Sequence, residues 1–165
     1  SMKEQNIEIA KMLGWVYIPE SDKSSFVYAE RTIGRNQVTE KNVVETHHCE
    51  LFVKNPQERD SIKLYDYKVY DVEEYSYQLE FDKDWNLLMK AVEFIEAQPE
   101  VFVDCQWDFL NDCFFSGVLC KNIKGHFFYH TAQTRIEAIF ETVHEYAKEL
   151  NNPHKTAAIN IIIIQ

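Results

Sequence analysis

The sequence predicts an α+β fold, a largely antiparallel sheet with helices packed on it in the manner of an α/β/α sandwich. Residues 80–96, EFDKDWNLLMKAVEFIE, place apolar side chains at helical spacing after a capping aspartate. Residues 101–110, VFVDCQWDFL, alternate between apolar and polar positions as a half-buried strand does. Predicted strands come in consecutive groups, and this order favours antiparallel pairing over strand–helix–strand units.

Composition predicts one globular domain over residues 2–153, with residues 154–165 as a C-terminal tail. The chain has 165 residues, 45% hydrophobic and 27% charged, and a domain of this size can bury a sizeable core. Ser1 before Met2 is interpreted as a cloning remnant. The opening residues lack the apolar stretch of a signal peptide, and no apolar run approaches the ~20 residues of a membrane helix. We therefore expect a cytoplasmic protein whose four cysteines are reduced thiols.

The first half of the chain predicts a short helix followed by several strands. Asn6 is expected to cap the helix, and Gly14 to end it. Residues 15–18 and 26–30 are predicted as short strands, and the polar residues 34–42 as a loop. Further strands are expected at residues 48–54, 61–72 and 75–81; Asn55-Pro56 ends the first of these.

The second half predicts helix, three-strand meander and helix. Asp82 or Asp84 is expected to cap the helix of residues 80–96, whose apolar stripe comprises Trp85, Leu88, Met89, Val92 and Ile95. Strands follow at residues 101–110, 113–120 and 126–130, and the first has an apolar face of Val101, Val103, Cys105, Trp107 and Phe109.

The last helix begins at the capping box Thr134-x-x-Glu137 and ends at residues 151–153, Asn-Asn-Pro. The isoleucine run of residues 161–164 has strong β propensity. It could add a strand to its own sheet, pair with a second copy, or be a non-native extension. A monomer and a tail-mediated dimer are therefore both open.

Three segments carry a resemblance to a known family. Residues 6–15, NIEIAKMLGW, residues 84–86, DWN, and residues 135–143, RIEAIFETV, resemble the phage ABA-sandwich domain proteins, small proteins of phages and gut-type bacteria. The resemblance implies helices on both faces of an antiparallel sheet, and a protein of phage or mobile-element type. It implies no catalytic residues, because the family has no assigned reaction. Most of residues 17–80 lies outside it.

Charge and tyrosine content indicate the class of partner. A net charge of −10 disfavours nucleic-acid phosphates and anionic membranes, and permits a basic protein partner. Residues 65–84, YDYKVYDVEEYSYQLEFDKD, place five tyrosines among carboxylates with only two lysines, and tyrosine is enriched at protein interfaces. Alternatively, the segment is an edge hairpin whose tyrosines lie over helices and whose carboxylates oppose edge pairing. The candidate partner-binding residues are Tyr67, Tyr70, Glu73, Glu74, Tyr75 and Tyr77.

The sequence predicts no catalytic residue, metal site or cofactor. His47-His48-Cys49 offers too few ligands for zinc, and His126 and His130 would stand ~13 Å apart on a strand. The expected function is a protein-binding module without enzymatic activity. Two alternatives remain: a nucleic-acid-mimicking inhibitor of a host protein, and a small hydrolase with an inward carboxylate or a His/Cys site.

Overall fold

The chain divides into two compact units, of which the second is inserted into the sequence of the first. The computed structural model describes residues 2–20, 25–33, 38–46, 49–58 and 68–152. The first unit combines residues up to 13 with those from 79 onward, and the second spans residues 14–78. The α+β class with largely antiparallel sheets is confirmed. A single domain over residues 2–153 stays a prediction, and the tail of residues 154–165 lies outside the described residues.

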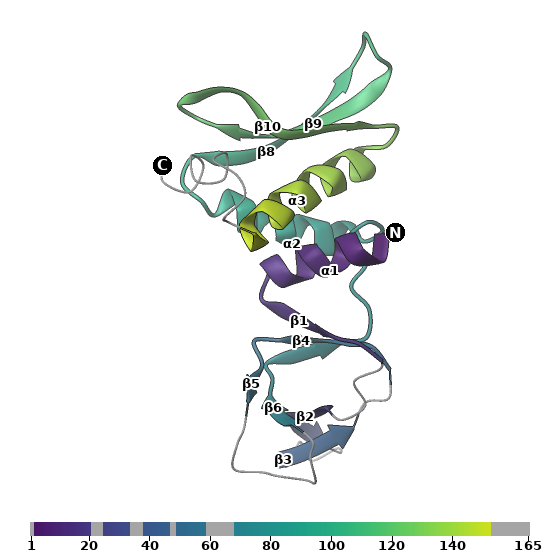
Figure 1. Ribbon diagram of the computed structural model, residues 1–165, viewed down its shortest axis with the longest axis vertical. Helices are drawn as coiled ribbons and strands as arrows, with labels where there is room; N and C mark the ends of the chain where they lie inside the picture. The colour runs from purple at the N-terminus through teal and green to yellow at the C-terminus, as the bar shows by residue number, and fades with distance from the viewer. Residues whose placement is uncertain (1, 21–24, 34–37, 47–48, 59–67, 153–165) are drawn as a thin grey trace. The chain divides into compact units, whose positions relative to one another are not determined.

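The described part of the first unit contains three helices and a three-stranded antiparallel sheet. Its elements are α1 (Met2–Met12), α2 (Trp85–Glu96), β8 (Val101–Asp108), β9 (Cys113–Cys120), β10 (Ile123–Ala132) and α3 (Arg135–Asn151). The sheet order is β10–β9–β8. α3 contacts all three strands, α2 contacts β8, and α1 packs on α3. Figure 1 shows these helices on one side of the sheet, whereas the family resemblance implies helices on both faces. None of the described helices is long and apolar enough to cross a membrane.

The core of the first unit lies between the helices and the sheet. Helix α2 buries Leu88, Val92 and Ile95 as its apolar spacing predicts, and also Ala91. Trp85, predicted on the same stripe, is 42% exposed because it is the first residue of the helix. From α3 the buried side chains are Ala138, Ile139, Phe140, Thr142, Val143, Tyr146 and Ala147.

Two of the three predicted helix starts are confirmed. The Asp84 side chain accepts hydrogen bonds from the backbone N–H groups of Asn86 and Leu87. Thr134 likewise accepts from the N–H of Glu137, so each side chain satisfies donors that the helix leaves unpaired.

The predicted start of the first helix is wrong. Helix α1 begins at Met2, and Asn6 lies in its interior at 6% exposure. Its amide donates to Asp82 Oδ1 at 2.9 Å and accepts from the N–H of Phe81 at 2.9 Å. The polar side chain that looked like a cap therefore joins α1 to the segment before α2.

The predicted meander is confirmed, with a longer third strand. β8 pairs with β9, and β9 with β10, whose register shifts between Ile123 and His126 and between Phe127 and His130. The predicted apolar face of β8 is buried at Val101 and becomes exposed toward Phe109, at 85%. Figure 1 shows the reason: the outer end of the β8–β9 hairpin extends beyond the helices.

The described part of the second unit contains two sheets. One has the order β1–β4–β7 and is antiparallel. The other has the order β3–β2–β6–β5, in which β2 and β6 run parallel. Buried Leu51 and Val53 of the first sheet pack against Ile18 and Val72. The strands are β1 (Trp15–Ile18), β2 (Ser25–Ile33), β3 (Val38–Thr46), β4 (Leu51–Lys54), β5 (Gln57–Glu58), β6 (Lys68–Asp71) and β7 (Glu74–Ser76).

Several predictions for this unit need correction. Residues 38–42, predicted as loop, belong to strand β3, because the β-forming residues that follow extend the pairing with β2 backward; residues 34–37 lie outside the described residues. The strand predicted at residues 61–72 is described only from residue 68, where β6 covers Lys68–Asp71. The strand predicted at residues 75–81 is only β7, Glu74–Ser76, since the Ser76 hydroxyl bonds both backbone groups of Gln78 in a local turn.

Candidate partner-binding surface

The structure gathers four of the six candidate residues at strand β7 of the second unit. Glu73, Glu74, Tyr75 and Tyr77 are all exposed and lie within or beside this strand. Tyr70 is half-buried on β6, in the other sheet of the same unit. Tyr67 lies outside the described residues. We call Glu73, Glu74, Tyr75 and Tyr77 the β7 surface.

Strand β7 lies at an edge of its described sheet, with β4 on its inner side. Tyr75 pairs with Val53 of β4, whose side chain is buried. The rings of Tyr75 and Tyr77 meet edge to face, with centroids 5.8 Å apart and planes at 76°. This is a favourable aromatic geometry, and it holds two exposed rings (40% and 53%) together.

Hydrogen bonds hold Glu73 against the end of strand β4. The N–H of Glu73 donates to the carbonyl of Lys54 at 3.2 Å, and Asn55 Nδ2 donates to Glu73 Oε2 at 3.2 Å. Asn55 is in turn fixed by Gly14, whose carbonyl accepts from the Asn55 N–H at 3.1 Å. Gly14 adopts φ +91°, and a Cβ at this position would come within 2.9 Å of Asn55 Oδ1. The predicted helix stop therefore also supports the acidic surface.

The cation nearest to the β7 surface in strand register is already engaged. Lys54 is the strand partner of Glu74. Its ammonium lies 5.8 Å from the ring centroid of Trp15, within the range of a cation–π interaction. The β7 surface thus presents carboxylates and phenol rings, which suit a basic protein surface.

Sequence reasoning missed a hydrogen-bonded pair of side chains on the sheet of the first unit. Asp104 of β8 and His126 of β10 meet across the central strand, with Asp104 Oδ2 3.0 Å from His126 Nε2. They meet over Gly117, where an added Cβ would lie 2.9 Å from His126 Cβ. The signal was the lone glycine in an otherwise regular strand, which often marks a close approach.

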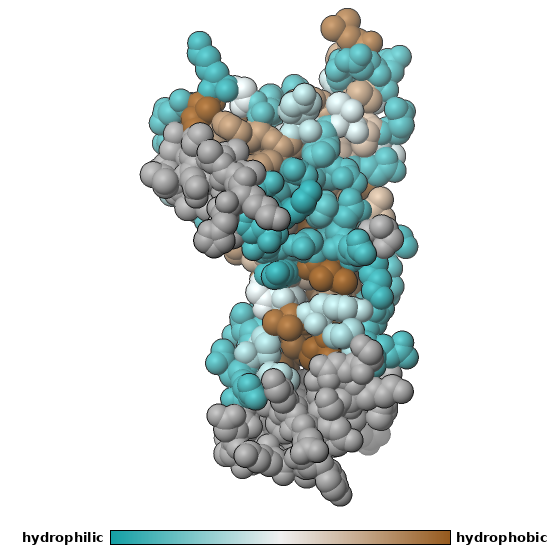
Figure 2. Space-filling model, viewed as in Figure 1, coloured by the Kyte–Doolittle hydropathy of each residue, from teal (hydrophilic) through white to brown (hydrophobic). Residues whose placement is uncertain are grey.

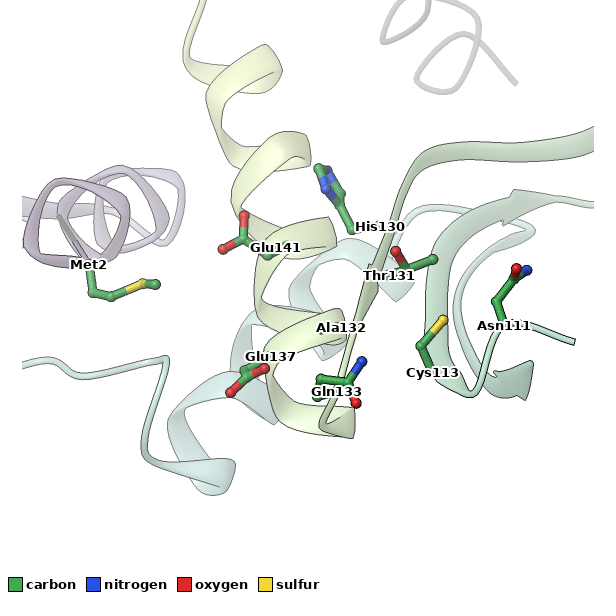
Figure 3. A pocket seen from close by; sticks show the side chains of 9 residues that line it. All are labelled: Met2, Asn111, Cys113, His130, Thr131, Ala132, Gln133, Glu137 and Glu141. Carbon is green, nitrogen blue, oxygen red and sulfur yellow. The ribbon is translucent and has the colours of Figure 1, made fainter. Parts of the chain in front are cut away.

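An open groove of about 920 Å³ runs along α3 and the end of the sheet. Its lining includes Cys113, His130, Glu137 and Glu141. In Figure 3 the two carboxylates point away from the Cys113 sulfur and the His130 ring. Glu141 also accepts long hydrogen bonds of 3.4 Å from Gln5 of α1. Neither carboxylate of the groove therefore faces the Cys113 thiol as a base.

The thiols and histidines form no metal-binding cluster in the described part of the chain. Burial raises the pKa of Cys105, opposed by Arg135 and assisted by Asp104, and burial also raises the pKa of Cys120. Both therefore favour the unreactive thiol. Across the described ranges, no three His, Cys, Asp or Glu side chains gather as metal ligands. Cys49 is exposed, and the two histidines that precede it in the sequence, His47 and His48, lie outside the described residues.

Comparisons with known proteins leave the family open. No protein-family model matches this chain, and neither a curated protein nor a solved structure shows significant similarity to it. Membership of the phage ABA-sandwich family stays a prediction from the three segments that carry the resemblance.

Proposed function

We propose that this protein is a binding module of phage or mobile-element type without enzymatic activity, whose β7 surface receives a basic protein partner in the cytoplasm. The observation that supports the proposal most is the joint exposure of Glu73, Glu74, Tyr75 and Tyr77 within or beside one strand at an edge of its described sheet. The net charge of −10 favours the same class of partner.

The geometry suits binding for three physical reasons. Tyrosine side chains give a large contact area for two rotatable bonds, and the contact between Tyr75 and Tyr77 reduces the freedom that binding would remove. Carboxylates at the rim steer a basic partner toward the surface and fix its register. The edge position of β7 also allows an extended segment of the partner to add to the sheet.

The test compares two double variants of matched chemistry. Glu73→Lys/Tyr75→Ala alters the β7 surface, where Tyr75 is 40% exposed. Glu93→Lys/Phe94→Ala makes the same kinds of change on α2, where Glu93 is exposed and Phe94 is 39% exposed. Each protein is used to capture partners from a host lysate, which are identified by mass spectrometry, purified and titrated against all three forms.

We expect the first double variant to weaken binding of the purified partner about tenfold or more, in line with the loss of one aromatic anchor. The control should bind like the wild type. Affinity should also fall as salt is raised, because exposed charges are screened. Equal binding by both double variants would refute the proposal.

Capture of a nucleic-acid-binding protein that DNA or RNA displaces competitively would favour the alternative of a nucleic-acid mimic. That outcome would change the class of partner, and the two double variants would still show whether the β7 surface carries the contact.

A further inference from the structure

The sheet of the first unit presents a second surface, distinct from the β7 surface. Paired residues on antiparallel strands share a face. Val101 and Val103 pair with Cys120 and Val118, and this is the helix-covered face, since Val101, Val118 and Cys120 are buried and α3 packs against both strands. The opposite face carries Phe102, Asp104, Phe115, His126 and Tyr129, which we call the aromatic platform.

Contacts between its members confirm that the aromatic platform is one surface. The Phe115 ring stacks on Tyr129, with centroids 5.6 Å apart and planes at 21°, and meets His126 edge to face at 4.8 Å. Phe102 is 55% exposed and Tyr129 is 63% exposed. Figure 1 shows the described helices on the other side of the sheet. Large aromatic side chains held in contact on a sheet face that the described helices leave open are typical of an interaction site.

The platform holds a carboxylate with capacity to spare. Asp104 keeps 31% of its side chain exposed. One oxygen, Oδ2, is taken by His126 at 3.0 Å, and the other, Oδ1, has no hydrogen-bond partner among the described residues. An ionised carboxylate accepts about four hydrogen bonds, so Asp104 can receive further donors beside the rings.

Local charge selects a cationic ligand. The only charged residues of β8 and β9 are Asp104 and Asp108. Asp108 pairs with Cys113 at the hairpin end, and its hydrogen bond from the Asn111 side chain lowers its pKa, so that it is ionised at neutral pH. The basic residues of β10 are Lys124, which lies beside the first register shift, His126, which already contacts Asp104, and His130. A phosphate backbone would meet carboxylates here.

The same sheet already shows how it holds a guanidinium. On its helix-covered face, the Arg135 guanidinium lies 5.4 Å from the ring centroid of Phe114. Arginine suits the aromatic platform for the same reason: its planar group stacks on rings, and its N–H fork bonds a carboxylate. Lysine is a compact, strongly hydrated charge that does neither as well. We propose that the aromatic platform binds an arginine side chain from an extended segment of a partner protein, with the guanidinium stacked on Tyr129 and bonded to Asp104.

Labelled model peptides test this inference on the full chain. The probes are a short peptide of arginines alternating with threonines, its lysine counterpart, and a single-stranded oligothymidylate. Binding is followed by fluorescence anisotropy at physiological salt. We expect the arginine peptide to bind about fivefold tighter than the lysine peptide or better, as stacking on an exposed ring allows. The oligonucleotide should not bind.

Single variants place the site. Tyr129→Ser and Asp104→Asn should each weaken the arginine peptide about fivefold or more. The matched controls Phe94→Ser and Asp112→Asn change an exposed ring on α2 and an exposed carboxylate at the hairpin turn, and they should leave binding unchanged. Amide NMR shifts should move in β8, β9 and β10.

Four results would overturn the inference: equal affinity for both peptides, shifts confined to other elements, oligonucleotide binding that Tyr129→Ser removes, or self-association of the wild type that the same substitution abolishes. None of these variants alters the β7 surface. Failure of this inference therefore leaves the proposed function unaffected, and failure of the proposed function leaves this inference unaffected.

Discussion

Replacing Asn6 by alanine tests how the first unit is held together. Asn6 is 6% exposed and makes two hydrogen bonds of 2.9 Å, to Asp82 and from the N–H of Phe81. A hydrogen bond to a charged group contributes about 1.5–3 kcal/mol and a neutral one about 1. Alanine also removes the acceptor of the Phe81 N–H, and Phe81 is only 1% exposed. Alanine's higher helix propensity offsets about 0.5 kcal/mol.

We therefore expect Asn6→Ala to lower the free energy of unfolding by about 3 kcal/mol. Urea unfolding followed by circular dichroism measures this change. The control is Asn86→Ala, since the Asn86 side chain is exposed on α2 and its removal should alter stability by less than about 0.5 kcal/mol. A double-mutant cycle with Asp82→Ala isolates the side-chain pair. If Asn6→Ala were as mild as Asn86→Ala, Asn6 would not join α1 to the segment before α2, and the reasoning would fail.

Three further predictions concern single sites of the first unit. Thr142 is fully buried, and its hydroxyl has no hydrogen-bond partner in the described part of the chain. Thr142→Val should therefore raise the free energy of unfolding by about 1 kcal/mol in urea, and a lower stability would show that the hydroxyl has a partner. Burial lowers the pKa of His144, and the charge of Glu141 opposes this effect. The unfolded chain therefore takes up the proton at higher pH than the folded chain, and stability should fall as the pH drops below 6.5. His144→Gln should reduce this dependence of stability on pH, and an unchanged dependence would contradict the role of His144. Phe109 and Leu110 are 85% and 95% exposed, and Figure 2 shows hydrophobic side chains at the outer end of the β8–β9 hairpin. Changing both to serine should alter stability by less than about 0.5 kcal/mol and shorten retention on a hydrophobic column. A large destabilisation would show that these side chains pack against the rest of the protein.

Local sequence signals predicted the elements that depend on local physics. The helix caps at Asp84 and Thr134 follow from side chains that reach donors two or three residues away. The stop at Gly14 follows from a backbone conformation, φ +91°, that glycine adopts at little cost. The β8–β9–β10 meander follows from alternation at period two with polar turns between the strands.

Local sequence patterns gave wrong predictions where a residue's partners lie far away in the chain. Asn6 looked like a cap because asparagine is favoured there, but its partners lie 75 and 76 residues away. Residues 38–42 looked like a loop because they are polar, but β2 pairs with them. The alternation of β8 gave the correct face without showing where the helices end, so Phe109 was placed on the apolar face although it is 85% exposed.

The candidate site was predicted in composition and only partly in geometry. Tyrosines and carboxylates in one segment indicated the surface, yet Tyr70 and Tyr75 lie in different sheets. The pair Asp104–His126 was missed because its members meet across an intervening strand at Gly117, a contact that no short sequence window contains.

Hydrogen–deuterium exchange of the wild type, with and without its purified captured partner, shows whether the partner binds at the β7 surface. We expect partner binding to slow exchange at residues 73–78 and at their strand neighbours on β4. This protection should disappear with Glu73→Lys/Tyr75→Ala. Unchanged exchange across residues 73–78, with protection confined to the helices of the first unit, would contradict binding at the β7 surface.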